Sequence, residues 1–162
     1  VYTKTIVSYL PDRNFLYKWM SVEDACKFYK DFYSDFDEKR FEELLDFMKL
    51  EKSMKIDTLS KGMHEKLNLS LVLSRDAKLY VLDEPIAGVD PVARDQILDA
   101  IINNYNEKSS MLITTHLVRD MENLFDEVVF LKEGEILLEG NAEILREEKG
   151  KQIDDIYKEI FG

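Results

Sequence analysis

The apolar positions of the chain form short runs and helical repeats that alternate along the sequence. The clearest run is residues 79–82, which two carboxylates and Pro85 follow. A short apolar run with polar borders is typical of a strand buried on both faces, as in a parallel α/β sheet. Similar runs at residues 4–10 and 110–114 predict two more strands, and Pro11 ends the first of them.

Amphipathic spacing predicts helices between these strands. Ser21 with Asp24 three positions later forms a capping box, and Asp37 stands where a second helix begins. Ser60 precedes a third periodic stretch, and Asp90, followed by a proline, precedes a fourth at residues 91–106. The faces expected to be buried are Ala25, Phe28, Tyr29 and Phe32; Phe41, Leu44, Leu45 and Met48; Leu67, Leu69, Leu71, Val72 and Leu73; and Ala93, Ile97, Ala100 and Ile101.

Smaller elements are predicted after residue 116. The spacing indicates an amphipathic helix over residues 117–125 and a strand at 128–131. Glu133-Gly134 is a hairpin signal that leads into a second strand at residues 136–138. Asn141 is placed to cap a short acidic helix, and residues 153–160 form the last one.

Composition limits the partners of the chain. A net charge of −11 over 162 residues speaks against nucleic acid as a partner and against direct binding to anionic lipid. No apolar stretch approaches the roughly 18 residues that would cross a bilayer, so we expect no direct membrane insertion. The single Cys26 permits no internal disulfide and fits a reducing, cytosolic setting. We therefore expect any membrane association to come through a partner.

Two places in the pattern suit a ligand, and the first of them suits an anion. A helix that begins after Ser60 would point the N–H groups of its first turn outward, with the positive end of the helix dipole behind them. Asp83 and Glu84 end a predicted central strand, at the edge of an open α/β sheet where ligands bind.

In this order and spacing the chain resembles the ATP-binding cassette (ABC) ATPases. Residues 60–62 match the LSGGQ signature of that family, and residues 79–83 match its Walker B strand. Glu84 matches the catalytic glutamate, residues 87–90 the D-loop, and His116 the switch histidine. Four such motifs in the correct order, with Glu84 counted as part of the Walker B motif, make the resemblance specific.

The resemblance implies an α/β fold with a partial P-loop NTPase (RecA-like) core. In this interpretation, residues 1–18 are the Q-loop strand and its loop, and residues 19–74 are a small helical subdomain that carries the signature helix. Residues 75–162 are then the rest of the core: a parallel sheet flanked by helices, with the Walker B strand, D-loop, switch histidine and C-terminal hairpin and helices.

The same resemblance implies ATP and Mg²⁺ as cofactors. Asp83 is suited to hold Mg²⁺ through a water, and Glu84 to activate the attacking water. His116 would donate a hydrogen bond to the γ-phosphate. Asp12 stands where the family has its Q-loop glutamine; it is either a second ligand for magnesium or water, or part of a plain Pro-Asp turn.

The signature departs from its commonest form at two positions. Ser60 and Gly62 keep the hydroxyl and the close backbone approach, but Lys61 replaces a glycine and Met63 a glutamine. Lys61 either adds a cation near a phosphate or points into solvent. The family's two ATPase subunits pair head to tail, as a homodimer or heterodimer, which would place Asp90 in the seam beside the second subunit.

Two other features have a structural and a functional interpretation. His64 and Glu65 begin the zinc pattern H-E-x-x-H, but Asn68 breaks it, so we expect His64 to face solvent or the subdomain. The aromatic and apolar residues between positions 15 and 20 are either folded into the core or exposed to a transmembrane subunit, which the family docks at this place.

The family's phosphate loop does not occur in the sequence. None of the six glycines belongs to a G-x-x-x-x-G-K-S/T loop, and none precedes Gly62. We therefore expect the chain to be a C-terminal fragment of the cassette that lacks the Walker A region and is inactive alone.

The leading functional hypothesis is the ATPase subunit of a bacterial exporter-like ABC transporter. It would couple ATP hydrolysis to transport through separate transmembrane subunits, at the inner face of the cell membrane. The alternative is a non-catalytic, nucleotide-dependent dimerisation or interaction module. A chromosome-maintenance or translation ATPase is disfavoured, because the chain has neither extended heptads nor a basic surface.

Overall fold

The structure is a computed structural model that describes residues 2–104 and 108–162. The chain divides into two compact units, residues 1–115 and 116–162. Each unit is described by itself.

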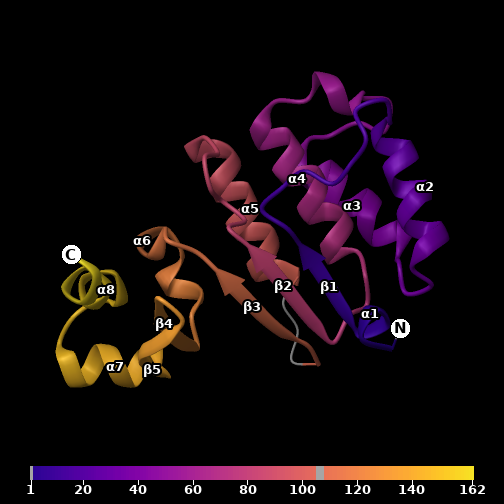
Figure 1. Cartoon of the computed structure of the whole chain (residues 1–162). Coiled ribbons are helices and arrows are strands. Elements are labelled where there is room, and N and C mark those ends of the chain that lie inside the picture. The colour runs from indigo at the N-terminus through magenta and orange to yellow at the C-terminus, as the bar shows by residue number, and fades with distance from the viewer. Residues whose placement is uncertain (1, 105–107) are drawn as a thin grey trace. The chain divides into compact units, whose positions relative to one another are not determined.

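The first unit combines a parallel sheet with helices (Figure 1). Its elements in chain order are α1 (Tyr2–Ile6), β1 (Val7–Leu10), α2 (Val22–Phe32), α3 (Glu38–Met48), a 3₁₀ turn (Ile56–Thr58), α4 (Lys61–Leu73), β2 (Leu79–Asp83), α5 (Pro91–Asn104) and β3 (Ser110–Thr114). The order of the strands in the sheet is β1-β2-β3, and both pairs are parallel. All three strands therefore end at the same edge of the sheet, as an α/β fold requires.

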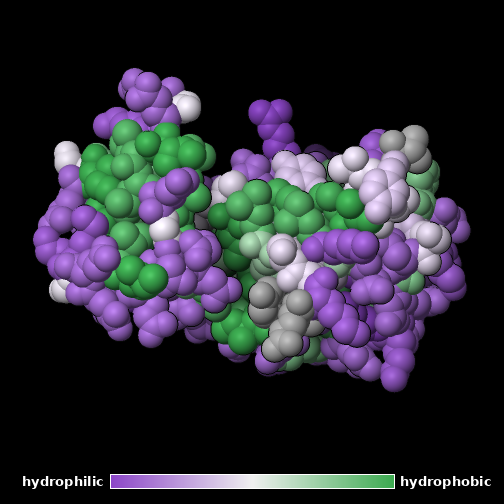
Figure 2. Space-filling model, turned by 90° about the horizontal axis from the view of Figure 1, so that it is seen from below, coloured by the Kyte–Doolittle hydropathy of each residue, from purple (hydrophilic) through white to green (hydrophobic). Residues whose placement is uncertain are grey.

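One face of this sheet is covered and the other is open. Leu10, Tyr80 and Leu82 are buried beneath the helices, and the Ser8 hydroxyl donates to the Val72 carbonyl of α4 at 2.8 Å. On the opposite face, Tyr9 and Leu112 are 51% and 55% exposed. Figure 2 shows hydrophobic residues gathered at the middle of this unit. The prediction that residues 79–82 are buried on both faces is therefore wrong, because only alternate side chains of β2 are buried.

The predicted caps start the helices of the first unit. Ser21 and Asp24 form a capping box at α2, and Asp37 accepts from the Arg40 N–H at the start of α3. The faces predicted for α3 and α5 are buried throughout. Phe32 was expected in the core but is 70% exposed at the last position of α2. Cys26 is buried, and this burial raises the pKa of its thiol to about 11, which makes the thiol inert.

A buried arginine holds the amino-terminal edge of the sheet together. The Arg75 side chain is 3% exposed and binds both carboxylate oxygens of Asp35, at 3.1 and 3.0 Å. It also donates to the carbonyls of Val7 and Lys4, and its guanidinium lies 3.9 Å from the centre of the Tyr33 ring. These contacts join α1, β1 and the turn between α2 and α3.

The second unit is a β-hairpin packed on helices. It contains α6 (Val118–Met121), a 3₁₀ turn (Glu122–Leu124), β4 (Glu127–Lys132), β5 (Glu135–Asn141), α7 (Ala142–Lys149) and α8 (Ile153–Phe161). The strands are antiparallel, as the hairpin signal predicts. Asn141 accepts from two N–H groups at the start of α7, so this cap is also confirmed. The core is formed by Val118, Val128, Phe130, Ala142, Leu145, Ile153 and Ile156.

Two predicted elements differ from the structure. Residues 4–6 belong to helix α1 rather than to the strand. The Thr5 hydroxyl donates a hydrogen bond to the Tyr2 carbonyl, and the Arg75 guanidinium donates one to the Lys4 carbonyl, which stabilises the helical turn. The helix predicted over residues 117–125 is only four residues long and continues as a 3₁₀ turn. Leu117 at its start offers no side-chain cap, so local hydrogen bonding does not support a longer helix.

Candidate functional site

The central strand ends on the acidic pair. Asp83 is the last residue of β2, and its Oδ1 accepts a hydrogen bond from the Thr114 hydroxyl at 2.5 Å. The Glu84 N–H donates to the Thr114 carbonyl at 2.9 Å. The ends of β2 and β3 are thus tied together where the carboxylates emerge. Asp83 is half-buried, so solvent reaches part of the residue.

Glu84 has an unusual backbone conformation. Its φ is +50°, in the left-handed region that residues with a side chain rarely adopt. Its carbonyl accepts from the Ala87 N–H at 3.1 Å, which closes a tight turn after the strand. Such a conformation costs on the order of 1–3 kcal/mol and concentrates at functional sites. The sequence gives no sign of it, because glutamate is not a residue that favours positive φ.

Asp12 lies at the same edge of the sheet. Leu10 pairs with Leu82, so the residues that follow β1 and β2 leave the sheet side by side. Asp12 is exposed two positions beyond β1. Among the described residues, however, no three acidic, histidine or cysteine side chains converge as a metal cluster.

The start of α4 is a capped helix end that faces solvent. Ser60 is exposed, and its hydroxyl accepts from the Met63 N–H at 3.3 Å. Gly62 is buried, and a Cβ on it would lie 3.1 Å from the Ala93 Cβ and 3.2 Å from Val89 Cγ1. Any larger residue at position 62 would require Ala93 and Val89 to shift, so glycine favours the close approach of α4 to α5.

The loop between β2 and α5 joins this helix start. Asp90 caps α5 by accepting from the Ala93 N–H at 3.0 Å. Gly88 has a φ of +66°, and a Cβ on it would lie 2.3 Å from the Lys61 ammonium. The Lys61 side chain therefore lies beside Gly88 of its own chain, and Lys61 is exposed to solvent. The first turn of α4 thus lies against the loop before α5, which brings together Ser60, Lys61, Gly62 and Asp90.

Lys61 and Asp12 both act electrostatically on Glu65. Burial raises the pKa of Glu65 to about 6, Lys61 lowers this pKa and Asp12 raises it. The loop after β1 is therefore close to the first turns of α4. Sequence reasoning missed Glu65, although its position one turn after Lys61 was a usable signal.

His116 follows β3 by two residues and is the first residue of the second unit. Its side chain is exposed. Thr114, which ends β3, pairs with Asp83. The chain therefore leaves the site edge of the sheet two residues before His116.

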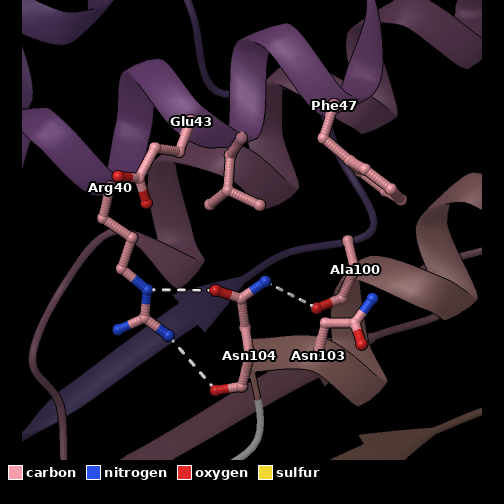
Figure 3. A pocket seen from close by; sticks show the side chains of 7 residues that line it. Arg40, Glu43, Phe47, Ala100, Asn103 and Asn104 are labelled. Atoms are coloured by element: carbon pink, nitrogen blue, oxygen red, sulfur yellow. Dashed lines mark hydrogen bonds between the residues drawn. The ribbon is translucent and has the colours of Figure 1, made fainter.

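A hollow of about 160 Å³ lies elsewhere, between α3 and α5 (Figure 3). Arg40 donates to the side-chain and backbone oxygens of Asn104 there, at 3.1 and 3.2 Å. Since α5 runs from the end of β2 to the start of β3, this hollow is at the amino-terminal edge of the sheet. It is a packing feature apart from the acidic pair.

The fold and the acidic strand end define the class of protein. A parallel α/β sheet with these features is the fold of a P-loop NTPase. A solved structure described as the ATP-binding subunit of an ABC transporter superposes on the chain with a TM-score of 0.82 at 24% identity; the match covers 98% of this chain and 70% of that one. At that identity the likeness shows the fold alone.

The chain belongs to the ATP-binding proteins of the ABC transporter family, whose model matches residues 2–87. It is 36% identical over 117 residues to Nod factor export ATP-binding protein I of Rhizobium meliloti, covering 70% of this chain and 35% of that protein. It is 28% identical over 151 residues to the uncharacterized ABC transporter ATP-binding protein YxlF of Bacillus subtilis, covering 90% and 51%. EcsA of the same organism, an ABC-type transporter ATP-binding protein, is 29% identical over 161 residues, covering 94% and 65%. The chain thus spans between 35% and 65% of the length of these relatives and covers part of the ATP-binding cassette.

Proposed function

We propose that the chain is part of an ATP-hydrolysing subunit that drives transport through separate membrane subunits. The observation that carries this proposal is the acidic pair at the carboxyl end of β2. Asp83 is oriented there by Thr114, and Glu84 is held in a strained turn. Family membership supports the same function.

Asp83 is the proposed magnesium residue. Its carboxylate and the Thr114 hydroxyl place oxygen atoms side by side, and oxygen is the donor that Mg²⁺ prefers. Asp12, at the same edge, is a second candidate ligand through water. Bound Mg²⁺ would supply charge neutralisation at the phosphates. Asp83 would orient the ion's water shell, and Thr114 would orient Asp83.

Glu84 is the proposed general base, which accepts the proton of the water that attacks the γ-phosphate. The tight turn fixes its backbone, so its carboxylate would need little reorganisation. His116 would donate a hydrogen bond to the γ-phosphate. These two residues are the proposed catalytic pair.

The exposed start of α4 is the proposed phosphate contact to ATP held by a second ATPase subunit. Ser60 would contribute its hydroxyl and Gly62 its backbone, while Lys61 would place positive charge at the same rim. Asp90, packed beside Gly62, would lie in the seam. Because each subunit would close on the other's nucleotide, the arrangement is a two-fold homodimer or heterodimer.

The loop after β1 is the proposed contact to a transmembrane subunit. Tyr17 and Trp19 are 59% and 69% exposed and stack at 5.9 Å, although Leu16 and Met20 beside them are buried. Exposed aromatic side chains of this kind are enriched at protein interfaces. Among the described residues, no helix is long and apolar enough to cross a bilayer. The subunit would therefore sit at the inner face of the cell membrane through its partner, and the likeness to Nod factor export proteins favours an exporter.

ATP hydrolysis by a longer form of the protein that carries a phosphate loop tests the proposal. We expect Glu84→Gln to lower turnover at least ~100-fold while ATP binding persists. The 162-residue chain alone should show no turnover, since its sequence has no phosphate loop.

Two outcomes would change the proposed function. Undiminished hydrolysis by Glu84→Gln would overturn the role of Glu84. A longer form that dimerises on ATP without any turnover would instead identify the non-catalytic dimerisation module.

A further inference from the structure

The loop at residues 11–20 is tied to α4 by two polar side chains. Asn14 Nδ2 lies 3.2 Å from His64 Nδ1, and the Asn14 Oδ1 accepts from the Leu16 N–H at 3.0 Å. Because the oxygen is engaged by a backbone donor, the nitrogen is the atom that faces the imidazole. An amide nitrogen only donates, so His64 Nδ1 must be the acceptor. The ring proton is therefore on Nε2, and the imidazole is neutral.

The surroundings of His64 favour this neutral form. The ring is half-buried, and burial lowers the pKa of His64 below its ordinary value of 6.5. The backbone of Ile56 raises this pKa, but its effect is smaller than that of burial. The imidazole thus connects three segments: the loop at residues 11–20, the 3₁₀ turn at Ile56–Thr58, and α4.

Protonation of His64 would break the contact with Asn14. A protonated imidazole carries N–H on both nitrogens, so Nδ1 would oppose the Asn14 amide donor. Rotating the amide to offer its oxygen would take that oxygen away from Leu16. The contact between Asn14 and His64 therefore has no equivalent hydrogen-bond arrangement when the imidazole is protonated.

We propose that His64 is a positioning residue that fixes the loop at residues 11–20 to α4 while its imidazole is neutral, and releases the loop when it is protonated. The loop carries Asp12 and the exposed Tyr17–Trp19 pair, and His64 lies one turn after Ser60. If the proposed function is correct, the contact between Asn14 and His64 connects the proposed surface for the transmembrane subunit with the start of α4, which is proposed to contact ATP. The tie itself does not depend on that function.

Trp19 is the single tryptophan of the chain, so it reports on this loop directly. We expect acrylamide quenching of Trp19 fluorescence to rise as the pH falls, with a midpoint below 6.5. His64→Asn keeps an acceptor near the Nδ1 position but does not titrate. It should give the low, neutral-pH quenching throughout. His64→Ala should give the high quenching at every pH.

Other charged groups require matched controls. The segments that meet at His64 carry seven other charged side chains: Asp12, Arg13 and Lys18 on the loop, Asp57 on the 3₁₀ turn at Ile56–Thr58, and Lys61, Glu65 and Lys66 on α4. Burial raises the pKa of Glu65 to about 6, so Glu65 needs a control of its own. The transition should persist in Glu65→Gln and in His116→Asn, which removes the only other histidine. Circular dichroism should show a folded chain across the range.

Three results would overturn the proposal: the same transition in His64→Asn, its loss in Glu65→Gln, or no transition in a chain that stays folded. Nitrogen NMR gives an independent readout, since the tie requires the proton on Nε2 of His64 at neutral pH. A proton on Nδ1 would contradict it. These measurements use no nucleotide, so their failure would leave the proposed ATPase function standing.

Discussion

The two edges of the parallel sheet use charge in opposite ways. At the amino-terminal edge, Arg75 is buried and every partner that the structure records for it is a carboxylate, a carbonyl or an aromatic ring. At the carboxyl-terminal edge, Glu84 sits at a φ of +50° and Asp12 is exposed. The first arrangement lowers the energy of the fold, whereas the second leaves an acidic residue in a strained conformation and another exposed to solvent. Substitutions at the two edges should therefore differ in the size of their effect on stability.

Arg75→Ala should give the largest loss of stability. It would leave Asp35 and the carbonyls of Val7 and Lys4 without their donor, at a cost of about 3–5 kcal/mol in the free energy of unfolding. Urea denaturation measures this loss. Lys39→Ala, which breaks an exposed ion pair with Glu43, is the control and should stay near the wild-type value. Equal losses in the two variants would remove the contrast between the edges.

Gly88→Ala should have an intermediate effect. Alanine at a φ of +66° is strained by about 1–2 kcal/mol, and its Cβ would also displace the Lys61 ammonium. Gly150→Ala is a matched control, because its φ is +61° and nothing lies within 4 Å. Because the Lys61 ammonium is the far end of a flexible, exposed side chain, it can move aside at little cost, so the two losses measured by thermal unfolding should be similar. A loss at Gly88 that clearly exceeds the loss at Gly150 would show that Lys61 is held in place.

Glu84→Gly should change stability little, within about 1 kcal/mol, although it deletes a charged side chain. Glycine adopts a positive φ without steric cost, which offsets what the side chain contributes. Asp83→Gly is the comparison, since it loses the Thr114 hydrogen bond and places glycine in a strand. We expect Asp83→Gly to be the less stable variant in urea. The reverse order would mean that Glu84 stabilises the fold.

Glu65→Gln should have the smallest effect and one that depends on pH. The pKa of Glu65 is raised to about 6 in the folded chain, above its ordinary value of 4.5, so the folded state holds the proton more tightly. The stability from this group is complete below pH 4.5 and is lost as the pH rises through about 6. Glu65→Gln should remove that slope and make the protein slightly more stable at pH 7. The gain stays below about 1 kcal/mol, because solvent reaches the carboxyl. Stability measured against pH would contradict this if the slope remained.

Features with a local cause were predictable from the sequence. Ser21, Asp37, Ser60 and Asn141 each cap the helix that follows them, because a cap needs only residues within one turn. The apolar run at residues 79–82 predicts that the strand ends near Asp83, and Asp83 is the last residue of β2. These features depend on sequence neighbours alone.

Features that join distant segments were not predictable. Arg75 meets Asp35 and Val7 across 40 and 68 positions, and Asn14 meets His64 across 50. The left-handed Glu84 results from the turn that links β2 to the loop before α5, which no propensity of glutamate indicates. Phe32 kept the helical spacing of a core residue but is at the last position of α2, where the core has ended. Periodicity says which face a residue belongs to, but it does not say how far the core extends.

The bare backbone of Gly62 has a mechanical consequence. With no side chain between them, the first turn of α4 packs directly against Val89 and Ala93. We therefore expect a displacement of the serine-capped start of α4 to shift the start of α5 and Asp90, which caps it. The starts of two helices that are far apart in the sequence are in this way coupled mechanically through one glycine.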